Sequence, residues 1–225
     1  MKNDGNLEKR SGPQIQKVKE IYGSIRFDIE SRLQEFEYLW TKGSEENVFH
    51  ELVFCLLTPQ SSARVCWETL CSLIKKNILN DAVPEEIAHE INRVRFKNNK
   101  SRYIVGARDF FTKAGNLSIK APLKELVGET NKREWLVNNI KGIGYKEASH
   151  FLRNIGMGRE IAILDRHILR NLVLLGVIEE IPKTLSRERY LAIEQKMADF
   201  ATDIKIPLDH LDLVLWYKEK NEIFK

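Results

Sequence analysis

Lys146 and Asp165 are the two residues of this 225-residue chain whose side chains and positions best suit covalent chemistry. The lysine follows a Gly142-Ile143-Gly144 turn at the start of a helical pattern, and the aspartate begins another helical pattern nineteen positions later. A neutral lysine amine attacks electrophilic carbon and leaves a Schiff base, while a carboxylate stabilises positive charge nearby. The pair therefore suits displacement at a carbon that becomes cationic as its bond breaks.

The chemistry requires Lys146 to be partly neutral and Asp165 to be charged. Burial in a cleft and a neighbouring cation, such as Lys141 or Arg166, both favour the neutral amine. The first turn of a helix favours a carboxylate, which can also cap that helix. The structural alternatives are that Lys146 is a surface lysine and that Asp165 is only a cap.

The turn that precedes Lys146 has the composition of an anion-binding site. Gly142 and Gly144 permit positive φ and a close backbone approach, and the amides at the start of the following helix point outward. We expect these glycines, with Lys141 and Tyr145 beside them, to contact a phosphate. The alternative is an ordinary corner between two helices, because short glycine motifs are weak signals.

The hairpin, Lys146, an apolar helix and Asp165 at the next helix start resemble, in that order, the catalytic core of the helix-hairpin-helix DNA glycosylases. The glycine of that family's Gly-x-hydrophobe-Asp segment is represented only loosely, by Gly156 and Gly158. In the family branch that also cuts the strand, a lysine occupies the position of Lys146. The resemblance implies base removal through a Schiff base, β-elimination of the 3′ phosphate, and a target base extruded from the duplex.

The polar segment Thr58-Pro59-Gln60-Ser61-Ser62 lies between two strongly apolar helical patterns. Its simplest function is to cap the second helix through Ser61 or Ser62. In the glycosylases that the chain resembles, the matching glutamine enters the duplex where the target base was. The resemblance therefore implies that Gln60 is the wedge, and its amide can both donate to and accept from the widowed partner base.

Among these enzymes the chain is most similar to the compact 8-oxoguanine DNA glycosylase/AP lyases of archaea and some bacteria, from about residue 28 to the end. In that family a Phe and a Trp sandwich the oxidised guanine, and the terminal lysine carboxylate binds its edge. The matching residues here are Phe96, Trp216 and Lys225. The alternatives are that Trp216 is a core residue, that Lys225 is a frayed end, and that the basic stretch 93–103 is a solvated helix end.

Composition narrows the class of protein without deciding it. Thirty-six Lys and Arg against 32 Asp and Glu give a net charge of +4, and 43% hydrophobic residues suffice for a core. No apolar run follows Met1, so we expect an intracellular protein of the cytoplasm or nucleoid with no membrane segment, acting as a monomer. The cysteines at positions 55, 66 and 71 show no metal-site spacing and are expected in the core. We therefore expect no metal and no cofactor, including the C-terminal iron–sulfur cluster of some relatives.

Helical periodicity extends along most of the chain, and no strand pattern of useful length occurs. The first helix is predicted over residues 14–40 with a break near Gly23, after a flexible segment 1–13, and other helices are predicted to begin at Ser44, Ser61 or Ser62, Pro84, Pro122, Asn131, Asp165, Ser186 and Pro207. A further helix is expected to run to Gly115. The predicted fold is all-α, a single unit of two helical lobes over residues 1–225 with a DNA-binding cleft, and its hairpin covers about 131–155.

The sequence therefore predicts an enzyme that acts on double-stranded DNA containing oxidised guanine, removing 8-oxoguanine and cleaving the strand. One alternative is the same chemistry on another lesion, such as an oxidised pyrimidine. Another is a non-catalytic module that uses its hairpin only to bind DNA phosphates.

Overall fold

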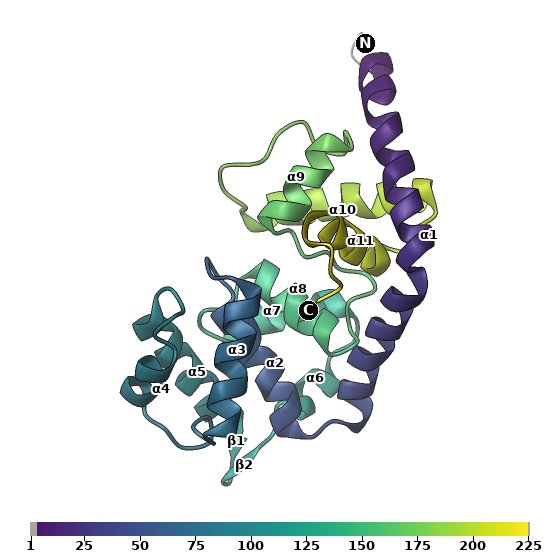
Figure 1. Cartoon of the computed structure of the whole chain (residues 1–225). Helices are drawn as coiled ribbons and strands as arrows, with labels where there is room; N and C mark the ends of the chain where they lie inside the picture. Colours follow the sequence, from purple (N-terminus) through teal and green to yellow (C-terminus); the bar gives the residue numbers. More distant parts are fainter. Residues whose placement is uncertain (1–3, 225) are drawn as a thin grey trace. The chain divides into compact units, whose positions relative to one another are not determined.

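The computed structural model describes the backbone of residues 4–224 and the side chains from Gly12 to Phe224. This part of the chain is almost entirely helical, in agreement with the predicted all-α class (Figure 1). It divides into two compact units. Unit 1 contains the chain up to Glu35 and from Gly158 onward, and unit 2 contains Phe36–Met157. No helix among the described residues is both long and apolar enough to span a membrane.

Helix α1 (Asp4–Lys42) is continuous through Gly23, so the predicted break is wrong. Buried Val18, Ile25 and Ile29 at helical spacing explain the continuity. Each such side chain contributes about 1.5–3 kcal/mol, whereas a helical glycine costs only about 0.5–1 kcal/mol relative to alanine. Helix also extends over Asp4–Pro13, a stretch that lies within the segment 1–13 that the sequence predicts to be flexible.

Unit 2 is a cluster of short helices with one small hairpin of strands. Its elements after α1 are α2 (Glu45–Leu57), α3 (Ala63–Lys75), α4 (Pro84–Glu90), α5 (Lys97–Phe111), β1 (Thr112–Lys113), β2 (Asn116–Leu117), α6 (Lys120–Glu125), α7 (Glu129–Asn139) and α8 (Tyr145–Asn154). Helix α2 is the central element, because it is buried over most of its length and contacts α3, α5 and α8. The residues that precede and follow α2 are therefore held firmly.

The antiparallel strands β1 and β2 replace the end of a helix that the sequence predicts to reach Gly115. Helix α5 ends at Phe111, and Ala114 and Gly115 form the turn with φ of +48° and +80°. Glycine adopts such values easily, so Gly115 serves a strand turn rather than a helix end.

Most predicted helix starts are confirmed. Ser44 accepts from the Asn47 amide in a capping box, and Asp165, Ser186 and Pro207 are the N-caps of their helices. Ser62 occupies the N-cap of α3, but its side chain makes no capping hydrogen bond. The prediction for Asn131 is wrong, because α7 begins earlier, after Gly128, which has φ of +80°. Helix α6 likewise begins before Pro122.

Unit 1 packs the first part of α1 with α9 (Arg166–Leu174), α10 (Arg187–Ile204) and α11 (Leu208–Lys220). The Tyr22 hydroxyl and His210 Nδ1 lie 3.1 Å apart and join α1 to α11. Tyr190 of α10 donates to the Ala162 carbonyl at 2.7 Å and accepts from the Leu164 amide at 3.2 Å. These bonds fix the extended segment that leads directly into Asp165.

Two of the three cysteines are core residues, as predicted. Cys55 and Cys66 are buried, whereas Cys71 is exposed on α3, so the prediction for Cys71 is wrong. Cys71 lies five residues after Cys66, which places the two side chains on different faces of the helix. Burial raises the pKa of both buried thiols, that of Cys66 to about 11.

Candidate active site

The predicted hairpin is present in unit 2, where α7 and α8 are joined by residues 140–144. Ile140 and Ile143 point into the core and are 2% and 6% exposed, which fixes the turn from inside. Gly142 and Lys141 are exposed, and Gly144 is the N-cap of α8. The first amides of α8 have no partner within the helix by geometry, so this end of the helix suits an anion.

Both its backbone conformation and the space around it require a glycine at position 142. Its φ is +91°, and a Cβ atom added there would lie 2.3 Å from Cδ2 of the Tyr103 ring on α5. The hairpin turn therefore packs directly against α5, at the last residue of the basic stretch 93–103.

Replacing Gly142 with alanine is expected to weaken binding to undamaged duplex DNA by about tenfold and to lower stability by about 1–3 kcal/mol. The turn must move away from Tyr103, which displaces the amides of α8. Fluorescence anisotropy with labelled duplex and thermal unfolding measure the two effects. Gly106→Ala is the matched control, because an added Cβ at this exposed position of α5 meets nothing within 4 Å. Normal duplex binding by the Gly142→Ala variant would contradict the prediction.

Tyr145 is engaged within the hairpin by its side chain. Its hydroxyl donates to Glu134 Oε2 at 2.6 Å, and the guanidinium of buried Arg133 lies 5.5 Å from its ring centroid. Arg133 Nη1 also donates to Ser149 Oγ at 3.2 Å. These contacts join α7 to α8, so the side chain of Tyr145 stabilises the hairpin.

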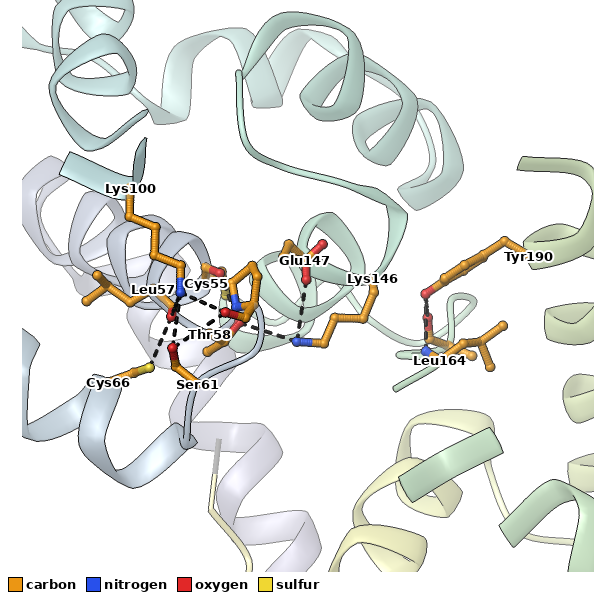
Figure 2. A network of polar contacts seen from close by, with 12 residues as sticks. Cys55, Leu57, Thr58, Ser61, Cys66, Lys100, Lys146, Glu147, Leu164 and Tyr190 are labelled. Carbon is orange, nitrogen blue, oxygen red and sulfur yellow. Dashed lines mark hydrogen bonds and ion pairs between the residues drawn. The ribbon is translucent and has the colours of Figure 1, made fainter. Parts of the chain in front are cut away.

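Lys146 is the second residue of α8, and its side chain is 24% exposed. Its Nζ donates to Thr58 Oγ1 at 3.3 Å and lies 3.7 Å from Glu147 Oε1 (Figure 2). Thr58 is the C-cap of α2, and its own hydroxyl donates to the Cys55 carbonyl at 2.9 Å. The amine is thus held at the end of the central helix while part of the side chain remains open to solvent.

The loop that follows Thr58 carries Gln60 in a strained conformation. Gln60 is exposed and has φ of +53°, a value that residues with a Cβ atom rarely adopt. The structure therefore brings the Lys146 amine to one end of the loop that presents Gln60.

Phe96 has the same unusual backbone conformation. It precedes α5 with φ of +60°, and its side chain is 53% exposed. The Arg95 guanidinium carbon lies 5.7 Å from its ring centroid. The Arg95 amide donates to Ser61 Oγ at 3.1 Å, which places this turn beside the Gln60 loop. An exposed aromatic ring held in a left-handed turn differs from the solvated helix end that the charge pattern alone suggests.

Asp165 lies in unit 1, at the N-terminus of α9. Its Oδ1 accepts from the amides of His167 at 2.7 Å and Ile168 at 2.8 Å, so the side chain is fixed by the helix that it caps. The carboxylate remains partly exposed. A carboxylate held this way has one fixed orientation and the support of the helix dipole.

Trp216 lies in the same unit and is half-buried on α11. Its ring makes an edge contact with His167, with the centroids 5.4 Å apart and the planes at 90°. Asn171 of α9 donates to Glu219 Oε1 at 3.1 Å and accepts from Lys218 Nζ at 2.7 Å. Two helices thus hold Asp165 and Trp216 in one unit. Lys225, the predicted terminal ligand of the base, lies outside the described residues.

Three residues near Lys146 were not predicted as site residues. Thr58 and Glu147 contact its amine, and Lys100 interacts with it through charge repulsion. Glu147 was detectable in principle, because it adjoins Lys146. The burial of Lys100 could not be predicted from the sequence, because lysine is among the residues that are least often buried. Within the described part of the chain, no cluster of His, Cys, Asp and Glu suits a metal ion.

Comparison with known proteins identifies the family. The family model described as 8-oxoguanine DNA glycosylase matches residues 29–206. An 8-oxoguanine DNA glycosylase/AP lyase of Fusobacterium nucleatum is 49% identical over 208 residues, covering 92% of this chain and 96% of that protein. One from Methanocaldococcus jannaschii is 41% identical over 217 residues, covering 94% of this chain and 99% of that protein.

Solved structures agree with the sequence matches. The Methanocaldococcus jannaschii 8-oxoguanine glycosylase/lyase in complex with 15mer DNA containing 8-oxoguanine has a TM-score of 0.84 and 39% identity, and covers 94% of this chain and 99% of that chain. The 8-oxoguanine DNA glycosylase of Thermotoga maritima has a TM-score of 0.83 and 34% identity, with coverages of 96% and 100%. The chain with the hairpin, Lys146 and Asp165 described above therefore belongs to the 8-oxoguanine DNA glycosylase family.

Proposed function

We propose that this protein excises 8-oxoguanine from double-stranded DNA and cleaves the strand 3′ to the resulting abasic site. The observation that carries the proposal is the Lys146 amine, partly exposed and held by Thr58 next to the exposed Gln60 loop. Family membership and the lesion-containing DNA complex of a relative support the choice of substrate.

In the proposed reaction the Lys146 amine attacks the anomeric carbon of an extruded nucleotide as the bond to the base breaks. The nitrogen forms a bond to that carbon, the electrons of the glycosidic bond leave with the base, and Asp165 stabilises the cationic sugar. The departing base takes up a proton from the attacking nitrogen. The C1′–O4′ bond then breaks, so that the nitrogen and C1′ form a protonated Schiff base and O4′ becomes a hydroxyl, and loss of a C2′ proton expels the 3′ phosphate. We further propose that residues 1–225 act as a single glycosylase unit and that the protein works as a monomer.

The proposed DNA contacts follow from the same arrangement. Gly142 and Gly144 with Lys141 and the Tyr145 amide bind a phosphate, and Gln60 fills the gap left by the base. Phe96, Trp216 and the Lys225 carboxylate form the base pocket in this proposal. A carboxylate suits guanine because it accepts from the N1 and exocyclic amino donors together.

A panel of lesion oligonucleotides with borohydride trapping tests the proposed function. Borohydride reduces a Schiff base to a stable amine, so the protein should become covalently attached to duplex DNA that contains 8-oxoguanine. If the protein prefers an oxidised pyrimidine, the proposed substrate is wrong but the Schiff-base chemistry still holds. Salt-dependent binding of undamaged duplex without any product would instead favour the non-catalytic DNA-binding module.

Adding a short glycine-serine tail after Lys225 is expected to slow 8-oxoguanine excision by about tenfold or more, because the terminal carboxylate is replaced by a neutral amide. Cleavage at a preformed abasic site, which has no base to recognise, should stay within about twofold. Single-turnover rates on the two substrates give the comparison. Equal rates of 8-oxoguanine excision with and without the tail would remove the carboxylate from the base pocket.

A further inference from the structure

Lys100 of α5 is a buried cation surrounded by oxygen atoms of one loop. The residue is 3% exposed. Its Nζ donates to the carbonyl oxygens of Leu57 and Pro59, each at 2.7 Å, and to Ser61 Oγ at 3.2 Å (Figure 2). An ammonium group has three N–H donors, and all of them are used here. A buried lysine needs such partners, because an unpaired buried charge is very unfavourable.

The acceptors lie on both sides of Gln60. Pro59 and Ser61 are its neighbours in the chain, and both are bonded to the same Lys100 nitrogen. Gln60 itself has φ of +53°. A residue with a Cβ atom remains in this conformation only where its surroundings impose it. Lys100 supplies that constraint, because its one ammonium group binds oxygens on both sides of Gln60.

The same group of contacts reaches Phe96. Ser61 Oγ accepts from Lys100 Nζ and also from the Arg95 amide at 3.1 Å. Phe96 follows Arg95 and is the second exposed residue with positive φ in this region, at +60°. Ser61 therefore links the loop of Gln60 to the turn of Phe96 through one hydroxyl group.

We propose that Lys100, acting through Ser61, is a positioning residue that fixes Gln60 and Phe96 relative to each other for opening the duplex and receiving the extruded base. The inference rests on the proposed function and adds a role for a buried residue that does not touch DNA. Neither loop residue is held by a helix of its own, since Gln60 follows the end of α2 and Phe96 precedes α5.

The electrostatics of Lys100 support a specific role. Burial, followed by repulsion from Lys146 and Arg95, lowers its pKa to about 8, although Cys66 and Glu147 act in the opposite direction. A lysine in this position is less favourable in its charged form than a lysine in water. The three hydrogen bonds to the loop therefore form at a free-energy cost, because burial disfavours the charged form of Lys100.

The anchor of Lys146 is also held by contacts that Lys100 does not make, although Lys100 binds the carbonyls of Leu57 and Pro59 on either side of Thr58. Thr58 Oγ1 donates to the Cys55 carbonyl at 2.9 Å, and the Thr58 amide donates to the same oxygen at 3.3 Å. Thr58 is thus fixed by the end of α2. Loss of Lys100 should therefore disturb the wedge and the base-stacking ring much more than the amine of Lys146, which Thr58 still holds.

This difference gives a test with two substrates. One is duplex DNA with 8-oxoguanine, which requires extrusion, and the other is a single-stranded oligonucleotide with a preformed abasic site, which requires only the amine. Lys100→Met keeps the length of the side chain and removes all its donors. We expect the ratio of duplex excision to single-strand cleavage, measured in single turnovers, to fall by about tenfold or more in this variant.

Lys120 provides the matched control within unit 2. It is 9% exposed, and its Nζ donates to the carbonyl oxygens of Trp40, at 2.9 Å, and Gly43. Lys120→Met therefore removes another buried lysine that caps a helix end, away from Gln60. Its thermal midpoint should fall, while the ratio of the two activities stays within about twofold of wild type.

If the ratio of duplex excision to single-strand cleavage is the same in Lys100→Met and Lys120→Met, Lys100 is not a positioning residue. Should Lys100→Met fail to fold, Ser61→Ala removes the shared hydroxyl from a partly exposed site and must lower the ratio in the same direction, or the inference fails. Wild-type protein that acts on neither substrate would refute the proposed function itself. An active wild type with an insensitive ratio refutes only the role of Lys100.

Discussion

Lys146→Gln is expected to give no covalent complex with 8-oxoguanine DNA after borohydride treatment, and to lose strand cleavage by about 10³-fold or more. An amide nitrogen is not nucleophilic, so no Schiff base can form. The fold should persist, because glutamine can still donate to Thr58 Oγ1 and the side chain is partly exposed. The measurement is the fraction of labelled oligonucleotide that is shifted on a denaturing gel.

Binding must be separated from chemistry in this experiment. The Lys146→Gln variant should bind lesion duplex within a few-fold of wild type, since most phosphate contacts in the proposal come from the hairpin. Lys124→Gln, at an exposed position of α6, controls for the loss of one positive charge and should trap normally. Undiminished trapping by Lys146→Gln would assign the Schiff base to another amine and end the proposed mechanism.

Asp165→Asn is expected to slow base excision by about 100-fold while changing stability by less than about 1 kcal/mol. Asparagine caps helices about as well as aspartate, so the bonds to the His167 and Ile168 amides can be kept. Only the negative charge is lost. Single-turnover excision and thermal unfolding of the same preparation measure the two quantities.

Asp165→Ala separates the two functions of this side chain. It removes the cap as well as the charge, so it should destabilise the protein by about 1 kcal/mol relative to Asp165→Asn. Excision should be similarly slow in both variants if charge is what matters. Wild-type excision by Asp165→Asn would show that Asp165 is only a cap, which is the structural alternative for this residue.

Features encoded within a few residues were predictable from the sequence. The capping residues Ser44 and Asp165 follow from local side-chain preferences, and the turn at Gly142 follows from its two glycines. The continuity of α1 through Gly23 was not predictable in this way. It depends on the buried positions on either side, which the local pattern does not weigh against the glycine.

Features that depend on contacts between residues far apart in the sequence could not be predicted from it. Lys100 reads as part of a basic surface stretch, yet it is buried because three oxygens from a loop about forty residues earlier surround its nitrogen. The packing of Tyr103 against Gly142 and the positive φ of Phe96 are of the same kind. The residues that interact with Lys146, namely Thr58, Glu147 and Lys100, were not predicted as site residues, because their contacts depend on the tertiary structure.

The burial of two of the three cysteines is relevant to the oxidising conditions under which guanine is damaged. Guanine is oxidised when peroxides and related species accumulate, and the same species attack protein thiolates. Burial raises the pKa of Cys66 to about 11, which disfavours its reactive thiolate at neutral pH, and its Sγ donates to the Leu57 carbonyl at 3.1 Å. Burial thus protects Cys55 and Cys66 from these agents, and thiol oxidation should occur first at Cys71, which is exposed.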